Sequence, residues 1–285
     1  MRWTSGDRGN IEDNRGSSGG GRMVPLGIGG VIIVALLSMY TGVDFFSILG
    51  GGGSSPAPTS VGTSGTVSAS PDEEKLVNMV DAVAADVQRT WTEQLGDRYP
   101  ATKVVLFRDS IQSACGYAGA VSGPFYCPGD RKVYLDLSFF EELTRRFGAP
   151  GDFAEAYVLA HEIGHHVQNV TGIEARVRGQ QRADPGSVNA LSVRLELQAD
   201  CYAGVWGHEA AQPGRAAKGQ VELDPGDYEQ ALRAAAAIGD DRLQKLGTGR
   251  VMPEKFTHGS SQQRVTWFRR GFESGDPRQC DTFNQ

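Results

Sequence analysis

The stretch AYVLAHEIGHHVQNV, residues 156–170, constrains this chain more than any other part of the sequence. His161 and His165 are four residues apart, and Glu162 directly follows the first histidine. At 3.6 residues per turn the two imidazoles lie on one helix face, where both can bind one Zn²⁺ ion. Apolar residues recur at helical spacing, so a helix over 153–170 is predicted. The HExxH pattern on such a helix is typical of metal-assisted hydrolysis with the glutamate as general base.

The alternative interpretation is a surface helix whose histidines are solvated. The residues before the motif are largely apolar, which favours a buried helix, and buried histidine and glutamate side chains need partners. His166 lies about 100° around the helix from His165 and is expected to face elsewhere. His208, near the end of a later predicted helix, is expected to be solvated.

The segment LSVRLELQADCYAGVWGHEA offers a third ligand. Glu196 and Asp200 are four residues apart on a predicted helix over 187–211 that is otherwise mostly apolar. Carboxylates in such a helix are costly unless they are paired or bind a metal. We therefore predict that Glu196 binds the zinc and that Asp200 accepts a hydrogen bond from the second ring nitrogen of His161. The alternative is that Glu196 pairs with Arg194 or another arginine.

His258 lies in the segment FTHGSSQQR, in a predicted loop before a helix. A loop histidine could reach the open position of the metal and stabilise the oxyanion of a tetrahedral intermediate. The alternative is a structural role beside the helix.

The N-terminal part of the chain predicts a membrane anchor. Residues 1–22 are rich in Gly, Ser and Arg and are predicted to be a disordered tail. Residues 23–43 carry no charge and match one bilayer crossing, which favours a signal anchor over a buried core helix or a cleaved signal peptide. Four arginines precede the span and the next basic residue is Lys75, so we expect a cytoplasmic N-terminus and an extracytoplasmic domain, in the periplasm or at the cell surface. Residues 44–70 read as a Gly/Ser-rich linker.

The catalytic domain is predicted to cover residues 71–285. It begins with an N-cap at Ser70, a proline at 71 and a capping-box Glu73. Two short β-branched or aromatic segments predict strands, and the remainder is helical, giving an α+β fold with a small sheet. An edge strand near 131–137 is expected to align an extended peptide. The predicted strands are 103–107 and 131–137, and the further helices are 138–147, 153–170, 187–211, 226–246 and 261–273.

The net charge restricts the possible partners, and the cysteines indicate the compartment. A net charge of -6 argues against a nucleic-acid-binding protein. None of the four cysteines forms a CxxC pair, so the common structural-zinc spacing is absent. Their even number fits two disulfides in an oxidising compartment, and the alternative is four buried thiols. The four are Cys115, Cys127, Cys201 and Cys280.

These residues resemble the bacterial putative neutral zinc metallopeptidase family over nearly the whole chain. The resemblance rests on the blocks SGPFYCPGDRKVYLDLSFF, AYVLAHEIGHHVQ, LSVRLELQADCYAGVWGH, AAAAIGDDRLQ and FTHGSSQQRVTWFRRGFESGDPRQCDTF. The family is similar to gluzincins, in which two histidines and a downstream glutamate hold zinc. The resemblance implies a zincin-like fold and one Zn²⁺ per chain on His161, His165 and Glu196.

The sequence therefore leads us to expect a single-pass, membrane-anchored zinc metalloendopeptidase. It would hydrolyse a peptide or protein substrate outside the cytoplasm through a zinc-activated water, with Glu162 as general base. We also predict Cys115–Cys127 and Cys201–Cys280 bridges. The alternatives are a non-catalytic, membrane-tethered zinc-binding scaffold and an HExxH hydrolase of a non-peptide amide.

Overall fold

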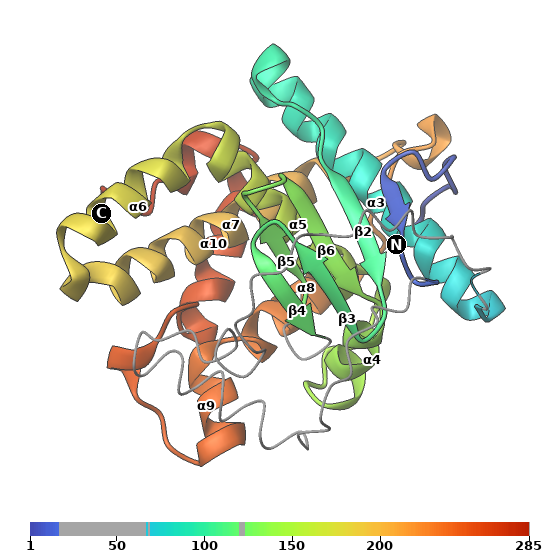
Figure 1. Cartoon of the computed structure of the whole chain (residues 1–285). Helices are drawn as coiled ribbons and strands as arrows, with labels where there is room; N and C mark the ends of the chain where they lie inside the picture. The colour runs from blue at the N-terminus through green and yellow to red at the C-terminus, as the bar shows by residue number, and fades with distance from the viewer. Residues whose placement is uncertain (17–66, 68, 120–122, 285) are drawn as a thin grey trace, which may run out of the picture.

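The computed structural model describes residues 1–16, 67, 69–119 and 123–284. Within them the fold is α+β with a mostly helical body (Figure 1). The strands are β1 (Ile11–Asp13), β2 (Lys103–Phe107), β3 (Ser110–Ser113), β4 (Gly116–Gly119), β5 (Phe125–Cys127) and β6 (Lys132–Asp136). The helices are α3 (Pro71–Leu95), α4 (Ser138–Arg145), α5 (Asp152–Val170), α6 (Ile173–Ala183), α7 (Val188–Ala210), α8 (Asp227–Ala237), α9 (Asp240–Thr248) and α10 (Ser261–Ser274).

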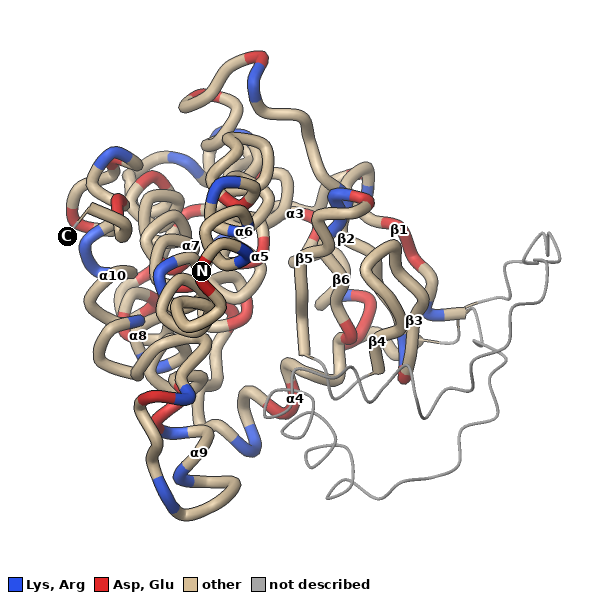
Figure 2. Tube along the Cα trace, turned by 60° about the vertical axis from the view of Figure 1, so that its left-hand side comes forward, with Lys and Arg blue, Asp and Glu red and all other residues tan. Residues whose placement is uncertain are grey.

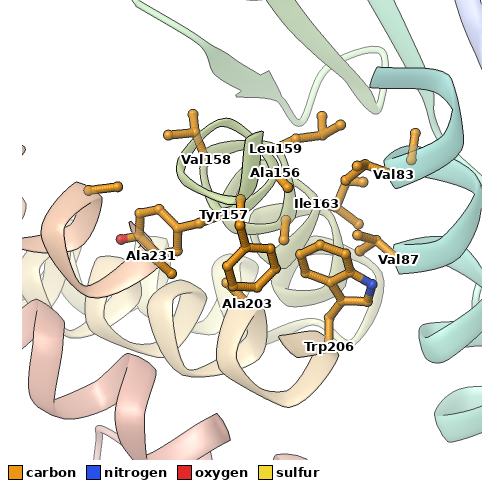
Figure 3. Packing of buried hydrophobic residues seen from close by; sticks show 14 of the residues in the cluster. Val83, Val87, Ala156, Tyr157, Val158, Leu159, Ile163, Ala203, Trp206 and Ala231 are labelled. Carbon is orange, nitrogen blue, oxygen red and sulfur yellow. The ribbon is translucent and has the colours of Figure 1, made fainter. Parts of the chain in front are cut away.

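The first helix of the domain, α3, begins as its sequence predicts. The Glu73 backbone N–H donates to the Ser70 hydroxyl at 3.1 Å, and Pro71 occupies the first turn. Its apolar stripe is buried, and Figure 3 shows Val83 and Val87 of this helix directed at the residues of α5. Local capping and helical periodicity therefore agree with the tertiary packing.

The main sheet has the strand order β1-β2-β6-β5. Strands β2 and β6, both predicted, pair in parallel, whereas β5 runs antiparallel to β6. Because β6 is paired on both sides, the expectation of an edge strand near 131–137 is wrong. The edge on that side is β5, a three-residue strand that is too short to give a sequence signal of its own.

Residues 1–16, here called the N-terminal arm, fold against the domain. Strand β1 pairs in parallel with β2, and Asn14 donates its backbone N–H to the Leu106 carbonyl at 2.8 Å. Asp81 of α3 is 1% exposed, and it accepts hydrogen bonds from the backbone N–H groups of Arg8 and Asn10. The prediction of a disordered tail is therefore wrong for these residues, because partners distant in sequence satisfy their backbone and charges.

The predicted membrane anchor needs a correction. Residues 23–43 and most of the predicted linker lie outside the described residues, and among the described helices none has the length and apolar character to cross a bilayer. A single crossing at 23–43 would also separate the arm from the domain, yet β1 and β2 pair directly. The predictions of a fold with one transmembrane helix and of a single-pass membrane protein are accordingly overturned.

Helix α5 is the centre of the core. Figure 2 shows it between α7 and the sheet strands, and in Figure 3 its residues meet side chains of α3, α7 and α8. Gly164 sets the spacing to α7, because a Cβ there would lie 3.1 Å from the Ala199 carbonyl oxygen. This close approach brings the turn of α7 that carries Glu196 beside the histidine face of α5.

Both predicted disulfides are present, Cys115–Cys127 with a Cα–Cα distance of 5.7 Å and Cys201–Cys280 with 5.6 Å. The second joins α7 to the turn that follows α10. Two bridges are typical of a protein that folds in an oxidising environment.

The predicted helix over 226–246 is two helices, α8 and α9, separated at Gly239. A Cβ at Gly239 would lie 2.3 Å from the Ser261 backbone nitrogen, so the chain at this break packs directly against the start of α10. The sequence also did not predict α6, which is mostly exposed and has only Val177 buried. The break at Gly239 places Asp240 beside the loop that carries His258.

Candidate metal centre

Three side chains from two helices converge on one point. His161 and His165 come from α5 and Glu196 comes from α7, and one ligand atom from each lies within 4.8 Å of the other two. His161 Nε2 is 3.2 Å from Glu196 Oε2, and His165 Nε2 is 3.4 Å from Glu196 Oε1. Ligands about 2.0–2.1 Å from a tetrahedral Zn²⁺ lie roughly 3.3 Å apart. The donor types and their spacing therefore fit one zinc ion.

The far nitrogen of each imidazole is held by a hydrogen bond. Asp200 Oδ1 lies 2.8 Å from His161 Nδ1, and Gln168 Oε1 lies 2.8 Å from His165 Nδ1. An acceptor at Nδ1 places the proton on that nitrogen and leaves the lone pair of Nε2 free for a metal. The structure thus puts Asp200 where its predicted role requires. Gln168 escaped sequence reasoning, although its position three residues after His165 is the signal that could have found it.

Two more buried side chains surround Asp200 and were also missed. The Tyr157 hydroxyl donates to Asp200 Oδ1 at 2.5 Å, and Arg264 of α10 donates to both carboxylate oxygens at 2.9 Å. Tyr157 lies one turn before His161 on the same helix, which is a local signal. Arg264 follows Asp200 by 64 residues and only tertiary packing brings the two together.

Glu162 is buried beside the candidate ligands, with 9% of its surface exposed. Burial raises the pKa of its carboxyl group, and the positive charges of His161 and His165 oppose that rise. A carboxylate whose pKa is raised toward neutrality by its surroundings is suited to accept and return a proton.

Neighbouring charges shift the pKa values of the candidate ligands His161 and Glu196. Burial lowers the pKa of His161, but the negative charge of Asp200 and the hydrogen bonds to Asp200 and Glu196 together raise it to about 9. Burial raises the pKa of Glu196, but the charges of His165 and His258 hold it well below its usual range. Glu196 is therefore an anion at neutral pH, as a metal-binding carboxylate must be.

His258 lies in the loop between α9 and α10, and Asp240 fixes that loop. Asp240 Oδ2 accepts the backbone N–H groups of Thr257, His258 and Gly259, and its Oδ1 lies 3.1 Å from His258 Nδ1. Burial lowers the pKa of His258, but the charges of Glu196 and Asp240 outweigh it and raise the pKa. The imidazole is 45% exposed, so the ring contacts solvent. It also experiences the negative charge of Glu196.

His166, His208 and Arg194 all have hydrogen-bond partners other than Glu196. His166 is fully buried, and its ring nitrogens contact the Tyr126 hydroxyl at 3.0 Å and the Pro100 carbonyl at 2.7 Å, so it faces away from Glu196. His208 is not simply solvated, because its Nδ1 lies 2.8 Å from the Phe272 carbonyl oxygen. Arg194 donates to the Phe283 carbonyl at 3.0 Å rather than to Glu196.

In this mostly helical α+β domain, an HExxH helix meets a glutamate from a second helix. The model of the putative neutral zinc metallopeptidase family matches residues 1–283, and the chain belongs to this family. Membership supports a zinc-dependent peptidase at the level of the family.

The chain is also similar to curated bacterial proteins. It is 48% identical over 298 residues to the Escherichia coli (strain K12) protein named "Uncharacterized protein YpfJ", covering 100% of this chain and 99% of that protein. It is 45% identical over 209 residues to the Mycobacterium tuberculosis (strain ATCC 25618 / H37Rv) protein named "Uncharacterized protein Rv2575", covering 72% of this chain and 70% of that protein. No solved structure matches the chain.

Proposed function

We propose that this protein is a zinc-dependent metalloendopeptidase in which His161, His165 and Glu196 hold the ion. The observation that carries the proposal is the spacing of these donors, 3.2 and 3.4 Å between imidazole nitrogens and carboxylate oxygens, with the buried Glu162 next to them. A structural zinc site is normally closed by four protein ligands, whereas three ligands leave a position for water or substrate.

When bound, zinc would act as a Lewis acid on the scissile carbonyl and would lower the pKa of a water molecule toward about 7. Glu162 accepts the proton of the attacking water as the new C–O bond forms at the carbonyl carbon. It then delivers that proton to the nitrogen of the leaving amine as the C–N bond breaks. The products are a carboxylic acid and an amine, and Glu162 ends in the state in which it began.

His258 is proposed to donate a hydrogen bond to the oxyanion that develops on the substrate. The support is its orientation by Asp240 and its raised pKa, which favours the protonated, donating form. We propose that the edge strand β5 aligns an extended peptide by strand addition. Tyr126 and Asn169 join this strand to α5 through a 2.8 Å hydrogen bond, so a peptide paired with β5 would run beside the histidine helix.

The test uses the purified full chain and compares wild type, Glu162→Gln and, as a matched charge change on the exposed surface of α8, Glu229→Gln. We expect one zinc per chain in all three proteins. We expect Glu162→Gln alone to lose about 10²- to 10⁴-fold in the rate of cleavage of a quenched fluorogenic peptide library, the contribution typical of a general base.

Each alternative has its own outcome. Zinc binding without any peptide cleavage in the wild type would favour a non-catalytic scaffold, or a hydrolase of another amide if a panel of non-peptide amides is turned over. Equal cleavage by wild type and Glu162→Gln would remove Glu162 from the mechanism. A wild type that takes up no zinc would overturn the proposal.

A further inference from the structure

We propose that Arg264 is a positioning residue of the metal centre: it clamps Asp200, and through Asp200 it fixes the imidazole of His161 for zinc. The inference rests on the zinc site proposed above, and it assigns a role there to the C-terminal helix α10, which supplies none of the candidate ligands.

The contacts form a chain from α10 to the candidate ligand. Arg264 Nε lies 2.9 Å from Asp200 Oδ2 and Nη2 lies 2.9 Å from Asp200 Oδ1, a two-pronged arrangement. The same Oδ1 lies 2.8 Å from His161 Nδ1. A two-pronged arginine–carboxylate pair fixes the plane and the rotation of the carboxylate, which a single hydrogen bond does not. The direction of the His161 ring therefore depends on where Arg264 holds Asp200.

Because the pair is buried, the position of Asp200 depends strongly on Arg264. Asp200 is 0% exposed and Arg264 is 3% exposed, so neither side chain can exchange its partner for bulk water. An unpaired carboxylate at this depth would turn toward other donors or take up a proton, and in both cases the acceptor for His161 would be disturbed. The low exposure of Arg264 also argues that it acts on the protein and does not bind substrate directly.

The packing of α10 on α7 is built to bring Arg264 to this place. A Cβ at Gly271 would lie 1.9 Å from the Cys201 carbonyl oxygen, and one at Gly204 would lie 2.1 Å from the Phe268 carbonyl oxygen. Glycine at both positions lets the two helices touch backbone to backbone. The Cys201–Cys280 disulfide joins α7 to the turn that follows α10. Side chains at either glycine would move Arg264 away from Asp200.

The structure offers a matched control in the pair of Arg215 and Asp86. Arg215 Nη2 lies 2.9 Å from both Asp86 oxygens, and the pair is also buried, with 12% and 2% of the side chains exposed. Asp86 accepts its other hydrogen bond from Trp206 Nε1, at 3.0 Å, and not from a candidate ligand. Replacing Arg215 by lysine therefore disturbs a comparable buried ion pair without touching the path to His161.

The experiment measures the Zn²⁺ dissociation constant of the full chain by competition with a chromogenic chelator, for wild type, Arg264→Lys, Arg264→Met and Arg215→Lys. Lysine keeps the charge of Arg264 but lacks its two-pronged geometry. We expect about a tenfold weaker zinc affinity for Arg264→Lys, with Arg264→Met at least as weak, which is the range typical of outer-shell partners. We expect Arg215→Lys to lower the melting temperature but leave zinc affinity unchanged.

The outcomes separate this inference from the proposed function. Folded Arg264 variants that bind zinc as tightly as wild type overturn the inference and leave the proposed function intact. Weaker zinc binding confined to the Arg264 variants supports it, even if no peptide is cleaved. If Arg264→Met does not fold, ¹⁵N spectra of the metal-free Arg264→Lys protein decide: a His161 ring with the wild-type Nδ1–H signal overturns the inference, and a changed one supports it. A wild type without zinc affinity overturns both proposals.

Discussion

The candidate metal centre and the contact between the N-terminal arm and the domain both gather carboxylates, but they satisfy them in different ways. In the arm, Arg15 is 1% exposed at its side chain and contacts Asp13, Glu73 and Glu74. At the metal centre, Glu196 faces two imidazoles. Arginine stays charged at any ordinary pH, whereas an imidazole gives up its proton to bind a metal. The arm contact is thus complete within the protein, whereas the donor set of the candidate metal centre is one that could hold an additional ion.

The largest effect should come from Glu196→Ala, which removes one of three donors. We expect the zinc affinity of the full chain to fall by more than about a hundredfold, because each ligand supplies a large share of the free energy of zinc binding. Chelator competition measures it. Glu209→Ala, on the same helix α7, is the control and should bind zinc like the wild type. Unchanged affinity in Glu196→Ala would show that the carboxylate is not a ligand.

Asp81→Ala should do the opposite, with a loss of stability and no loss of zinc affinity. Asp81 accepts two backbone N–H groups and the Asn10 side-chain amide, all from the arm. Removing a buried charged acceptor should lower the free energy of unfolding by about 2 kcal/mol. Urea denaturation of the zinc-free protein gives this value. If zinc affinity also fell, the two regions would be coupled and the contrast between them would fail.

Arm docking and zinc binding should respond to acid at different pH values. Hydrogen bonds from Arg15 lower the pKa of Asp13 and of Glu74. Groups with a lowered pKa stabilise the docked arm above their ordinary values of about 4, and this stabilisation is lost as the pH falls through the lowered values. The pKa of His161 is instead raised to about 9, by Asp200 against the opposing effect of burial, so a proton competes with zinc as soon as the pH falls below that value.

We therefore expect zinc affinity to decrease steadily from pH 9 to pH 5 while the arm stays docked. Chelator competition follows the first property, and hydrogen exchange at the β1 amides, corrected for its intrinsic pH dependence, follows the second. Exchange at β1 that rises together with the loss of zinc would mean that one titration controls both regions. The effect of acid on arm docking should be the smallest of the three, since the carboxylates of the arm are partly exposed and screened by solvent.

The features that local patterns predicted have partners within one helix or at its end. The start of α3 at Ser70 and the shared face of His161 and His165 follow from capping and helical geometry, which act over a few residues. Patterns were insufficient for β1 and β5, whose three residues carry no periodicity. The charge-free run over 23–43 predicts a membrane span, but hydropathy carries no information on the pairing of β1 with β2.

The sequence by itself determined which side chains can share a helix face and, with the family resemblance, which glutamate to test as the third donor. Only the tertiary structure decided that Arg264 clamps Asp200 and that the arm belongs to the sheet. The physical reason is the range of the interactions. A helix fixes neighbours one turn apart through its own hydrogen bonds, whereas a contact such as the one between Asp200 and Arg264, 64 residues apart, exists only after glycines and a disulfide have set two helices against each other.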